Sequence, residues 1–363
     1  MHIEALELAD FRSYQRLSFT PAPSLNILTG PNAQGKSNLL EGLAVLLVGR
    51  SFRGAKPVDL PRWGAARATV SGDVRRIEST RPVRRVVAAR EDGAWVVTGE
   101  GCAWARAIPF SWTDLNIVTG GPVGRRNFLD GFVAKIYPAY AATFQRYRQV
   151  LFRRNHVLQR RLPASQIQAE IEPWSEQLVA LGIEVLARRR QATAAIRSEV
   201  RKIYPLLGGR AEVDIEYRTS LGESPTPEEF RRALGVRHAD EIRRGLTLVG
   251  PHRDDLMLSL DGRELRVFGS RGQQRLVALT LRLAEAGPVE EAVGSAPVLL
   301  LDDALSELDP GVQRRVIDHV AQAGQVFLTS ADAALPDLAM ARWWEVKGGE
   351  VREPSFAAVR GAA

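Results

Sequence analysis

The fold of this chain is decided by Gly30-Pro31-Asn32-Ala33-Gln34-Gly35-Lys36-Ser37, which fits the phosphate-loop pattern G-x-x-x-x-G-K-[ST]. An apolar run at residues 25–29 precedes the pattern, and a leucine-rich run at residues 38–48 follows it. A strand, a glycine loop and a helix in this order form a cradle in which backbone N–H groups surround phosphates. We expect Lys36 to reach the β- and γ-phosphates and the Ser37 hydroxyl to ligate Mg²⁺.

The second half of such a site is predicted at Val298-Leu299-Leu300-Leu301-Asp302-Asp303. Its apolar residues predict a strand buried on both faces of a parallel sheet. The two acids follow at the carboxyl end of that strand, where ligands of such sheets bind. Asp302 is placed to hold Mg²⁺ alongside Ser37, and Asp303 is placed to orient and polarise an attacking water molecule.

The remaining pattern predicts an α/β head with an inserted helical lobe. The head would comprise residues 1–122 and 244–363, and residues 67–100 indicate a small antiparallel sheet within it. Between residues 123 and 243, apolar residues recur at three- and four-residue steps, as is typical of helices. In the last part of the chain we expect strands at 246–249, 256–260, 297–301 and 325–329, and helices at 273–286 and 312–323.

Prolines punctuate the helical lobe, and this favours several packed helices over one long coiled coil. The interrupting residues are Pro163, Pro173, Pro205 and Pro225.

Length, composition and cysteine content are those of a globular protein of about two domains. The chain has 363 residues, of which 45% are hydrophobic and 25% charged. Its single cysteine, Cys102, permits no internal disulfide, which fits a reducing cytosol. We find neither an apolar run of membrane-spanning length nor the layout of a signal peptide, so we expect a cytoplasmic protein without a membrane partner.

Arginine makes the chain basic. Lysine and arginine total 49 against 42 acidic residues, so the net charge is +7, and the isoelectric point is about 9.9. This balance favours a nucleic-acid partner. The alternative is that the arginines reflect a GC-rich genome and cover solvated helix faces.

The stretch Phe268-Gly269-Ser270-Arg271-Gly272-Gln273-Gln274 opens the helix predicted at 273–286. The free N–H groups and the dipole of a helix start make an anion site. The stretch resembles the signature sequence L-S-G-G-Q of ABC-type ATPases, which closes over the γ-phosphate bound by a partner subunit. Taken singly, Ser270 is also an ordinary helix N-cap residue.

Over nearly its whole length the chain resembles the RecF family, bacterial recombination-mediator ATPases of the SMC-like branch of the ABC ATPases. The most specific matches are the R-R-x-F-L-D block at residues 125–130 and the G-P-H-R-D-D block at residues 250–255. These blocks separate the family from transporter ATPase subunits. The matching segments are 8–14, 30–41, 51–53, 121–130, 151–155, 250–256, 270–275 and 301–309.

The resemblance implies an ABC-type P-loop ATPase head, with a mixed sheet, an antiparallel subdomain and no long coiled coil. It implies an ATP-dependent homodimer that binds double-stranded DNA near single-stranded gaps and, with RecO and RecR, promotes RecA loading. The setting would be recombinational repair, replication restart and the SOS response, in a cytoplasmic, nucleoid-associated protein. Its ATPase would be weak and DNA-dependent and would serve as a conformational switch.

The resemblance also assigns roles to residues of this sequence, with ATP and Mg²⁺ as cofactors. Lys36, Asp303 and Ser270 would be catalytic, and Ser37 and Asp302 would hold the metal. The D-loop, which crosses the dimer interface in the family, would be Ser306, Glu307, Leu308 and Asp309. The ATP-binding set would be Arg12, Gly30, Pro31, Asn32, Ala33, Gln34, Gly35, Lys36, Ser37, Asn38, Ser270, Arg271, Gly272 and Gln273.

The sequence predicts the DNA-binding residues less specifically than the nucleotide site, because arginine patches are also typical of solvated helix faces. For Arg125 and Arg126, which belong to a family block, contact with DNA, an interface and a salt bridge are all open. The aromatic stripe from Tyr137 to Tyr147 favours a helix core over a base-stacking platform. The candidate DNA-binding residues are Arg125, Arg126, Arg153, Arg154, Arg188 and Arg189.

Two positions depart from the family's pattern. Asp114 stands where a Q-loop is expected, but the neighbouring residues do not match, so its contact with metal is open. Thr329-Ser330 stands where transporter relatives place a histidine. A hydroxyl cannot perform the same proton chemistry, so slow hydrolysis is expected.

Three other classes of protein explain fewer features of the sequence. A transport ATPase subunit would not need the helical lobe or the basic charge. A chromosome-tethering SMC head would need a longer coiled-coil arm than residues 123–243 allow. A small-molecule kinase would have no use for the signature sequence.

Overall fold

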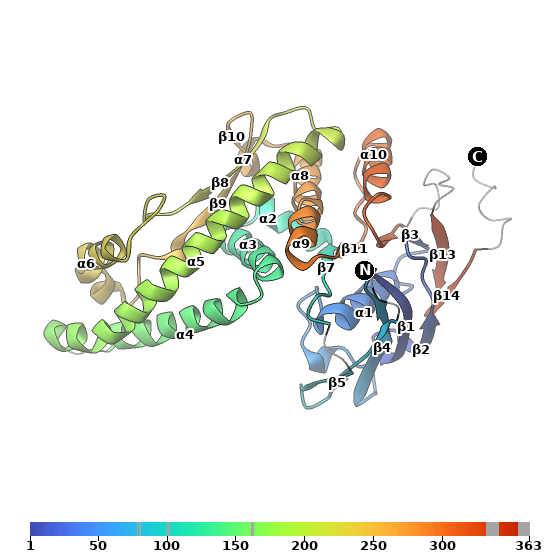
Figure 1. The fold of residues 1–363 in the computed structure, drawn as a ribbon, viewed down its shortest axis with the longest axis horizontal. Helices are drawn as coiled ribbons and strands as arrows, with labels where there is room; N and C mark the ends of the chain where they lie inside the picture. Colours follow the sequence, from blue (N-terminus) through green and yellow to red (C-terminus); the bar gives the residue numbers. More distant parts are fainter. Residues whose placement is uncertain (78, 80, 100–101, 161–162, 332–340, 355–363) are drawn as a thin grey trace. The chain divides into compact units, whose positions relative to one another are not determined.

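The computed structural model describes the whole chain except residues 78, 80, 100–101, 161–162, 332–340 and 355–363 (Figure 1). It forms two compact units: the first comprises Met1–Leu115, Lys202–Arg210 and Ser270–Ala363, and the second Asn116–Arg201 and Ala211–Gly269. The boundaries predicted at 122/123 and 243/244 differ from these. The second unit continues to Gly269 because strand β8 (Val213–Arg218) pairs with β9 (Asp255–Leu260), beyond the predicted end of the lobe.

The first unit contains a six-stranded sheet in the order β14-β13-β3-β12-β11-β7. Strand β12 (Val326–Thr329) runs parallel between β3 (Leu25–Thr29) and β11 (Val298–Leu301). The carboxyl ends of β3 and β11 therefore lie at one edge, with a single strand between them. The flanking strands are β7 (Ala107–Phe110), β13 (Arg342–Lys347) and the antiparallel β14 (Glu350–Arg352).

A second, antiparallel sheet of the first unit has the order β2-β1-β4-β5-β6. The prediction of a small antiparallel sheet within residues 67–100 is confirmed, and the N-terminal hairpin extends that sheet. The strands are β1 (His2–Phe11), β2 (Tyr14–Phe19), β4 (Arg67–Arg75), β5 (Val83–Arg90) and β6 (Trp95–Gly99).

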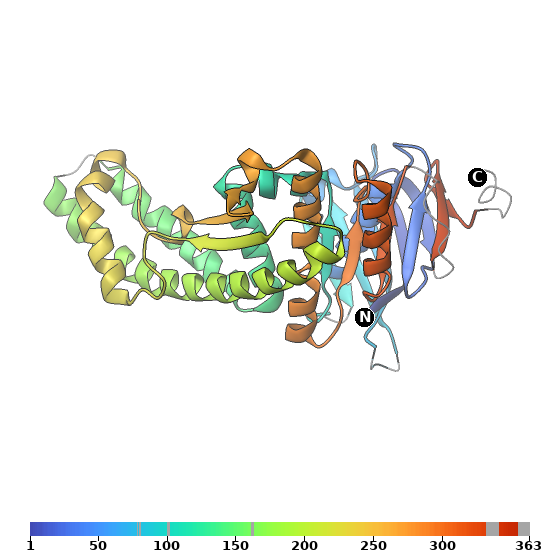
Figure 2. The ribbon, with the colours of Figure 1, turned by 90° about the horizontal axis from the view of Figure 1, so that it is seen from above.

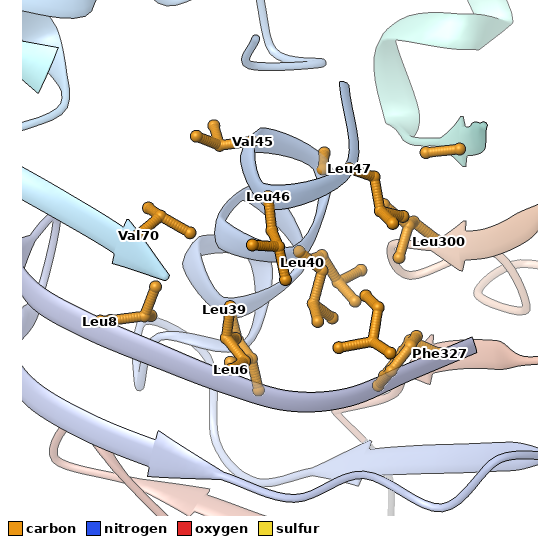
Figure 3. Packing of buried hydrophobic residues seen from close by; sticks show 14 of the residues in the cluster. Leu6, Leu8, Leu39, Leu40, Val45, Leu46, Leu47, Val70, Leu300 and Phe327 are labelled. Atoms are coloured by element: carbon orange, nitrogen blue, oxygen red, sulfur yellow. The ribbon is translucent and has the colours of Figure 1, made fainter. Parts of the chain in front are cut away.

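Helix α1 (Lys36–Val48) is buried on almost every side because it packs against both sheets. Figure 3 shows its leucines between Leu6 and Val70 of the antiparallel sheet and Leu300 and Phe327 of the parallel sheet. Each fully buried leucine contributes about 1.5–3 kcal/mol of transfer free energy. This packing holds the first turn of α1, and with it Lys36 and Ser37, in a fixed position at the sheet edge.

Three further helices belong to the first unit: α8 (Arg271–Leu283), α9 (Ala286–Val293) and α10 (Pro310–Val320). The short α2 (Leu115–Thr119) begins at the last residue of the first segment of this unit, and its other residues belong to the second unit. The helix predicted at 273–286 is α8, which ends at Leu283, and a separate helix, α9, begins at Ala286. The break precedes Pro288, which has no N–H to continue the hydrogen-bond ladder.

The second unit is built on four helices and a three-stranded sheet in the order β10-β9-β8 (Figure 2). Its helices are α3 (Pro122–Ile136), α4 (Tyr140–Leu158), α5 (Ala164–Leu206, whose end belongs to the first unit) and α6 (Pro227–Arg244). Smaller elements are β10 (Arg263–Glu264) and α7 (Leu265–Phe268). Thr143 bonds to Glu184 and Arg154 to Ser175, so α4 and α5 run antiparallel.

Two local predictions for this region are wrong. Helix α5 runs through Pro173, although a proline in a helix interior costs about 3 kcal/mol; burial of the neighbouring Ile171 and Leu178 offsets that cost. Residues 246–249 form no strand, because side chains bond their backbone. Asn155 accepts from the Thr247 N–H at 2.8 Å, and Glu241 accepts from the Leu248 N–H at 2.7 Å.

The other predictions of fold class are confirmed. The head has a mixed sheet and an antiparallel subdomain, and the described residues form no long coiled coil. Within the described part of the chain, no helix combines the length and apolarity that a bilayer crossing requires.

Candidate nucleotide site

The phosphate loop, residues 30–37, joins β3 to α1 in a backbone conformation that requires glycine at two points. Gly30 has φ of 137° and Gly35 has φ of 114°, both in the region that side chains disfavour. A Cβ atom on Gly30 would lie 2.3 Å from the carbonyl oxygen of Val346. On Gly35 it would lie 2.9 Å from the hydroxyl of Tyr14, which donates a hydrogen bond to the Gly35 carbonyl. The loop is therefore closely packed against the backbone of Val346 at Gly30 and against the side chain of Tyr14 at Gly35.

Lys36 is the first residue of α1, and its ammonium group folds back over the loop. Its Nζ donates to the carbonyl oxygens of Gly30 and Pro31, the second at 2.9 Å. Burial lowers the pKa of Lys36, while Asp302 and Asp303 act in the opposite direction. The charged ammonium group at the positive end of a helix is suited to phosphate.

Asp302 follows β11 and meets two hydroxyl groups at one carboxylate oxygen. Ser37 Oγ and Thr329 Oγ1 each donate to Asp302 Oδ1 at 2.9 Å. Burial raises the pKa of Asp302, and these hydrogen bonds oppose the shift. A nearby cation stabilises the ionised form of such a desolvated carboxylate.

Ser37 and Asp302 offer the hard oxygen ligands that Mg²⁺ prefers. The described residues contain no cluster of three or more acidic, histidine or cysteine side chains that would form a complete metal cage. Mg²⁺ usually keeps water and phosphate oxygens as its other ligands, so two protein ligands fit this ion.

Asp303 has a left-handed backbone with φ of 51°, which is uncommon for a residue with a side chain. Its N–H donates to Thr329 Oγ1 at 2.8 Å. Thr329 therefore bonds both acids of the pair. Its strand was predicted, but this role was not, since a lone hydroxyl in sequence carries no signal for it.

These groups share a cleft of about 350 Å³, within the range of small-molecule sites. Trp112 stands on its wall with 72% of its surface exposed. The described lining residues are Asn32, Ala33, Gly35, Lys36, Ser37, Asn38, Arg53, Trp112, Asp302, Asp303, Thr329 and Ala331. Trp112 and Arg53 were not among the predicted site residues. The S-F-R segment at 51–53 was a usable signal for Arg53.

Arg12 does not line this cleft in the structure. Its guanidinium forms a two-pronged bond to Glu41, with Nε and Nη2 each 2.8 Å from a carboxylate oxygen. Glu41 is fully buried and also accepts from Ser51, while Arg53 lies 3.9 Å away. Glu41 therefore anchors two arginines beside the phosphate loop.

The signature loop, residues 270–273, is exposed and begins α8. Ser270 caps the helix: its Oγ accepts from the Gln273 N–H at 3.3 Å, and its own N–H donates to Gln273 Oε1 at 2.9 Å. None of these four residues lines the cleft described above. The D-loop follows Asp303, with Glu307 and Asp309 exposed and Leu308 buried.

Comparison with known proteins identifies the family. The chain is 38% identical over 346 residues to the DNA replication and repair protein RecF of Heliobacterium modesticaldum, covering 91% of this chain and 92% of that one. It is 32% identical to the protein of the same name from Bacillus subtilis, covering 91% and 93%. The chain belongs to the RecF family. A family model described as an AAA domain also matches residues 5–156.

Solved structures agree with this assignment. The recombination mediator protein RecF with ATP, from the RecFOR pathway, superposes with a TM-score of 0.86 at 26% identity over 98% of both chains. An Smc head bound to a domain of ScpA superposes with a TM-score of 0.57 at 15% identity, which shows a shared fold. The predicted SMC-like ABC ATPase head is therefore confirmed.

In this RecF-family chain, the carboxylate of Asp114 is already engaged. It lies 2.6 Å from Nη2 of Arg282 and accepts from the Ser111 N–H at 2.7 Å. Asp114 is buried, whereas its neighbour Trp112 reaches the cleft. Asp114 thus holds the loop that positions Trp112.

The two RecF-family blocks meet inside the second unit. Arg125 binds Asp255 with two bonds of 2.7 Å, and Arg126 donates to the Asp254 carbonyl at 2.8 Å. Asp130 binds Arg189, which also donates to the carbonyl of Pro251. The blocks are therefore structural partners, although Arg125 and Asp255 are 130 residues apart in the sequence.

Three of the six predicted DNA-binding arginines are buried, and the structure contradicts that prediction. Arg125, Arg154 and Arg189 pair with Asp255, Glu241 and Asp130, respectively. A charge is stable in the interior only when paired and hydrogen-bonded, so these arginines serve the fold. Arg153 is exposed, and Arg126 and Arg188 are partly buried.

Arg154→Met is expected to destabilise the second unit by about 3–5 kcal/mol, because it leaves the fully buried Glu241 without its ion-pair partner. Thermal unfolding followed by circular dichroism measures the loss. The neighbouring Arg153→Met, which removes an exposed guanidinium, is the matched control and is expected to unfold at the wild-type temperature. Equal melting temperatures of both variants would contradict the structural role of Arg154.

Proposed function

We propose that this chain is an ATP-dependent clamp on double-stranded DNA near single-stranded gaps, acting in recombinational repair and replication restart. ATP joins two copies, and slow hydrolysis separates them. The observation that carries this proposal is the hydrogen-bonded set of Ser37, Asp302 and Thr329 beside the phosphate loop, in one cleft. Such a cleft supplies a phosphate cradle, a metal anchor and an acid at the position of the attacking water.

In this proposal each residue of the cleft has one task. The phosphate loop and Lys36 bind the phosphates, and Ser37 and Asp302 hold Mg²⁺. When bound, the metal neutralises charge that develops on the phosphate oxygens. Asp303 orients a water molecule and accepts its proton.

Hydrolysis should be slow. A histidine at the end of β12 could take part in proton transfer, but this chain has Thr329 there, and its hydroxyl is committed to Asp302 and to the backbone of Asp303. A switch, unlike a pump, functions at low turnover. Stimulation of the ATPase by DNA, and not by membrane extract, distinguishes this function from that of a transport subunit.

The exposed signature loop supports pairing of two copies. It forms the start of helix α8, which is the positive end of the helix dipole, yet it does not line the cleft of its own copy. We place Ser270 and Gly272 over the γ-phosphate held by a second copy. To shift the population from mostly separate to mostly paired, ATP must favour the paired state by roughly 5.5 kcal/mol.

Sedimentation velocity with ATP, ADP or no nucleotide tests the clamp. We expect a dimer with ATP and a monomer with ADP or without nucleotide. Gapped duplex DNA should make the ATP-bound dimer more stable. Ser270→Arg is expected to bind ATP normally but to remain a monomer, because the larger side chain obstructs the neighbouring γ-phosphate. A dimer of this variant with ATP would contradict the proposed pairing.

We propose helix α4 as the DNA-facing surface. It carries four arginines and no acidic residue. Arg146, Arg148 and Arg153 are exposed and have no ion-pair partner among the described residues; we call them the α4 basic face. The exposed Phe152 and His156 lie among them. Arg146 and Arg153 are seven residues apart and lie on one side of α4, whereas Arg148 lies about 160° around the helix from Arg146. Such unpaired guanidinium groups fit the phosphates of a DNA backbone.

Replacing all three residues of the α4 basic face with glutamine is expected to weaken DNA binding in the presence of ATP. Each lost phosphate contact lowers the slope of log affinity against log salt by about 0.9, so the slope should fall by about 2.7. Fluorescence anisotropy of labelled duplex DNA over a salt series measures it. The control replaces Arg231, Arg232 and Arg237 of α6, which removes equal charge; an equal slope change in both variants would assign the effect to net charge.

The family resemblance adds RecO and RecR as partners and RecA loading as the outcome. We include these in the proposal. Pull-down of RecR with and without ATP tests binding to this partner.

A further inference from the structure

Arg275 lies on the second turn of α8, directly after the signature loop, and its side chain reaches the acid pair of the same copy. Its Nη2 donates to the carbonyl oxygen of Asp303 at 2.6 Å and to Ser306 Oγ at 2.5 Å. Its Nη1 lies 3.8 Å from the carboxylate of Glu307. One guanidinium therefore contacts the catalytic acid's backbone and two residues of the D-loop.

The backbone of Asp303 is held on both sides. Thr329 bonds its N–H, and Arg275 bonds its carbonyl oxygen. Both Asp303 and Glu307 have left-handed backbones, with φ of 51° and 62°. Such conformations are costly for residues with side chains and persist only where the surroundings enforce them.

The burial of Arg275 argues against a chance contact. The residue is 8% exposed, although arginines are seldom buried without a full set of partners. Its Nε is buried with no hydrogen-bond partner among the described residues. Leaving Nε unpaired costs free energy, which the contacts of Nη2 with Asp303 and Ser306 must offset.

We propose that Arg275 is a positioning residue that aims the carboxylate of Asp303 into the cleft and couples it to the signature loop. Ser270 begins α8 and Arg275 lies on its second turn, so a displacement of the loop by a neighbouring copy's nucleotide moves the guanidinium. Through this contact, pairing with a second copy changes the position of Asp303 in the same copy as the signature loop. This inference rests on the proposed ATPase function. It adds a physical connection between the signature loop and the catalytic acid Asp303.

Arg275→Met in the full-length protein tests the proposal. We expect the affinity for a fluorescent ATP analogue and the ATP-dependent dimer to be retained, because the phosphate loop and Ser270 are intact. The kcat for ATP should fall by about 100-fold, as for a misplaced catalytic group. Arg275→Lys, which keeps the charge but not the forked geometry, should have an intermediate kcat. The matched control is Arg314→Met on α10, whose guanidinium pairs with the exposed Asp318; its kcat should equal that of the wild type.

Hydrogen exchange of residues 303–308 gives a readout independent of turnover. In Arg275→Met we expect faster exchange there, without a change in the phosphate loop. A kcat within twofold of the wild type, or unaltered exchange, overturns the inference. If the wild type fails to hydrolyse ATP, the proposed function fails, and the exchange experiment still decides whether Arg275 holds the loop.

Discussion

Lys36→Met should abolish ATP binding and, with it, dimer formation and ATP-dependent DNA binding. The ammonium group lies over the phosphate loop and is the buried cation of the cleft. Charge-assisted hydrogen bonds contribute about 1.5–3 kcal/mol each, so loss of contacts to two phosphates should lower the affinity by at least about 100-fold. Equilibrium titration with a fluorescent ATP analogue measures this loss.

The three losses should occur together, because nucleotide is the link between the copies in the proposed clamp. Lys56→Met is a suitable control, since that lysine lies in the same unit and its side chain does not line the cleft. A Lys36→Met protein that no longer binds ATP but still forms dimers would show that pairing has another cause.

Asp303→Asn is expected to reduce kcat by at least about 100-fold while leaving ATP affinity nearly unchanged. Asparagine has almost the shape of aspartate but cannot accept the proton of the attacking water. Asp302 and Ser37, the proposed metal ligands, are left intact. The variant should therefore remain a dimer with ATP for far longer than the wild type.

Single-turnover hydrolysis and size-exclusion chromatography with ATP together check this result. Asp302→Asn provides the contrast, because it should impair Mg²⁺-dependent ATP binding as well as hydrolysis. If Asp303→Asn hydrolyses ATP at the wild-type rate, another group activates the water. If it is a monomer with ATP, the switch model is wrong.

The motifs predicted the nucleotide cleft well, for a physical reason. Close packing and positive φ at Gly30 and Gly35, together with a fully buried β11, leave few alternatives at those positions. Residues that act at a distance in sequence were harder to predict. Thr329 reaches the cleft because of the sheet order, and Trp112 because of the loop at Ser111. Arg53 reaches it because Glu41 and Asn38 of α1 hold its guanidinium.

The arginines show the limit of prediction from sequence. Arg153 and Arg154 are neighbours of the same type, yet one is exposed and the other is buried against Glu241. Successive residues of a helix point about 100° apart, so only the position of α5 and α6 around α4 decides which of the two meets solvent. Of the six proposed DNA contacts, the structure removes three by this rule.

The sequence by itself determined the family of the protein and the positions of the phosphate loop and the acid pair, because local spacing and burial specify such motifs; the role of residues 270–273 as a signature loop stays a prediction. Tertiary structure alone decided which charges are buried and where the signature helix reaches. Arg275 and Asp303 are 28 residues apart, and no local pattern relates them. Their contact exists because α8 and the segment after β11 pack in the same unit, where a forked guanidinium can reach a strained backbone.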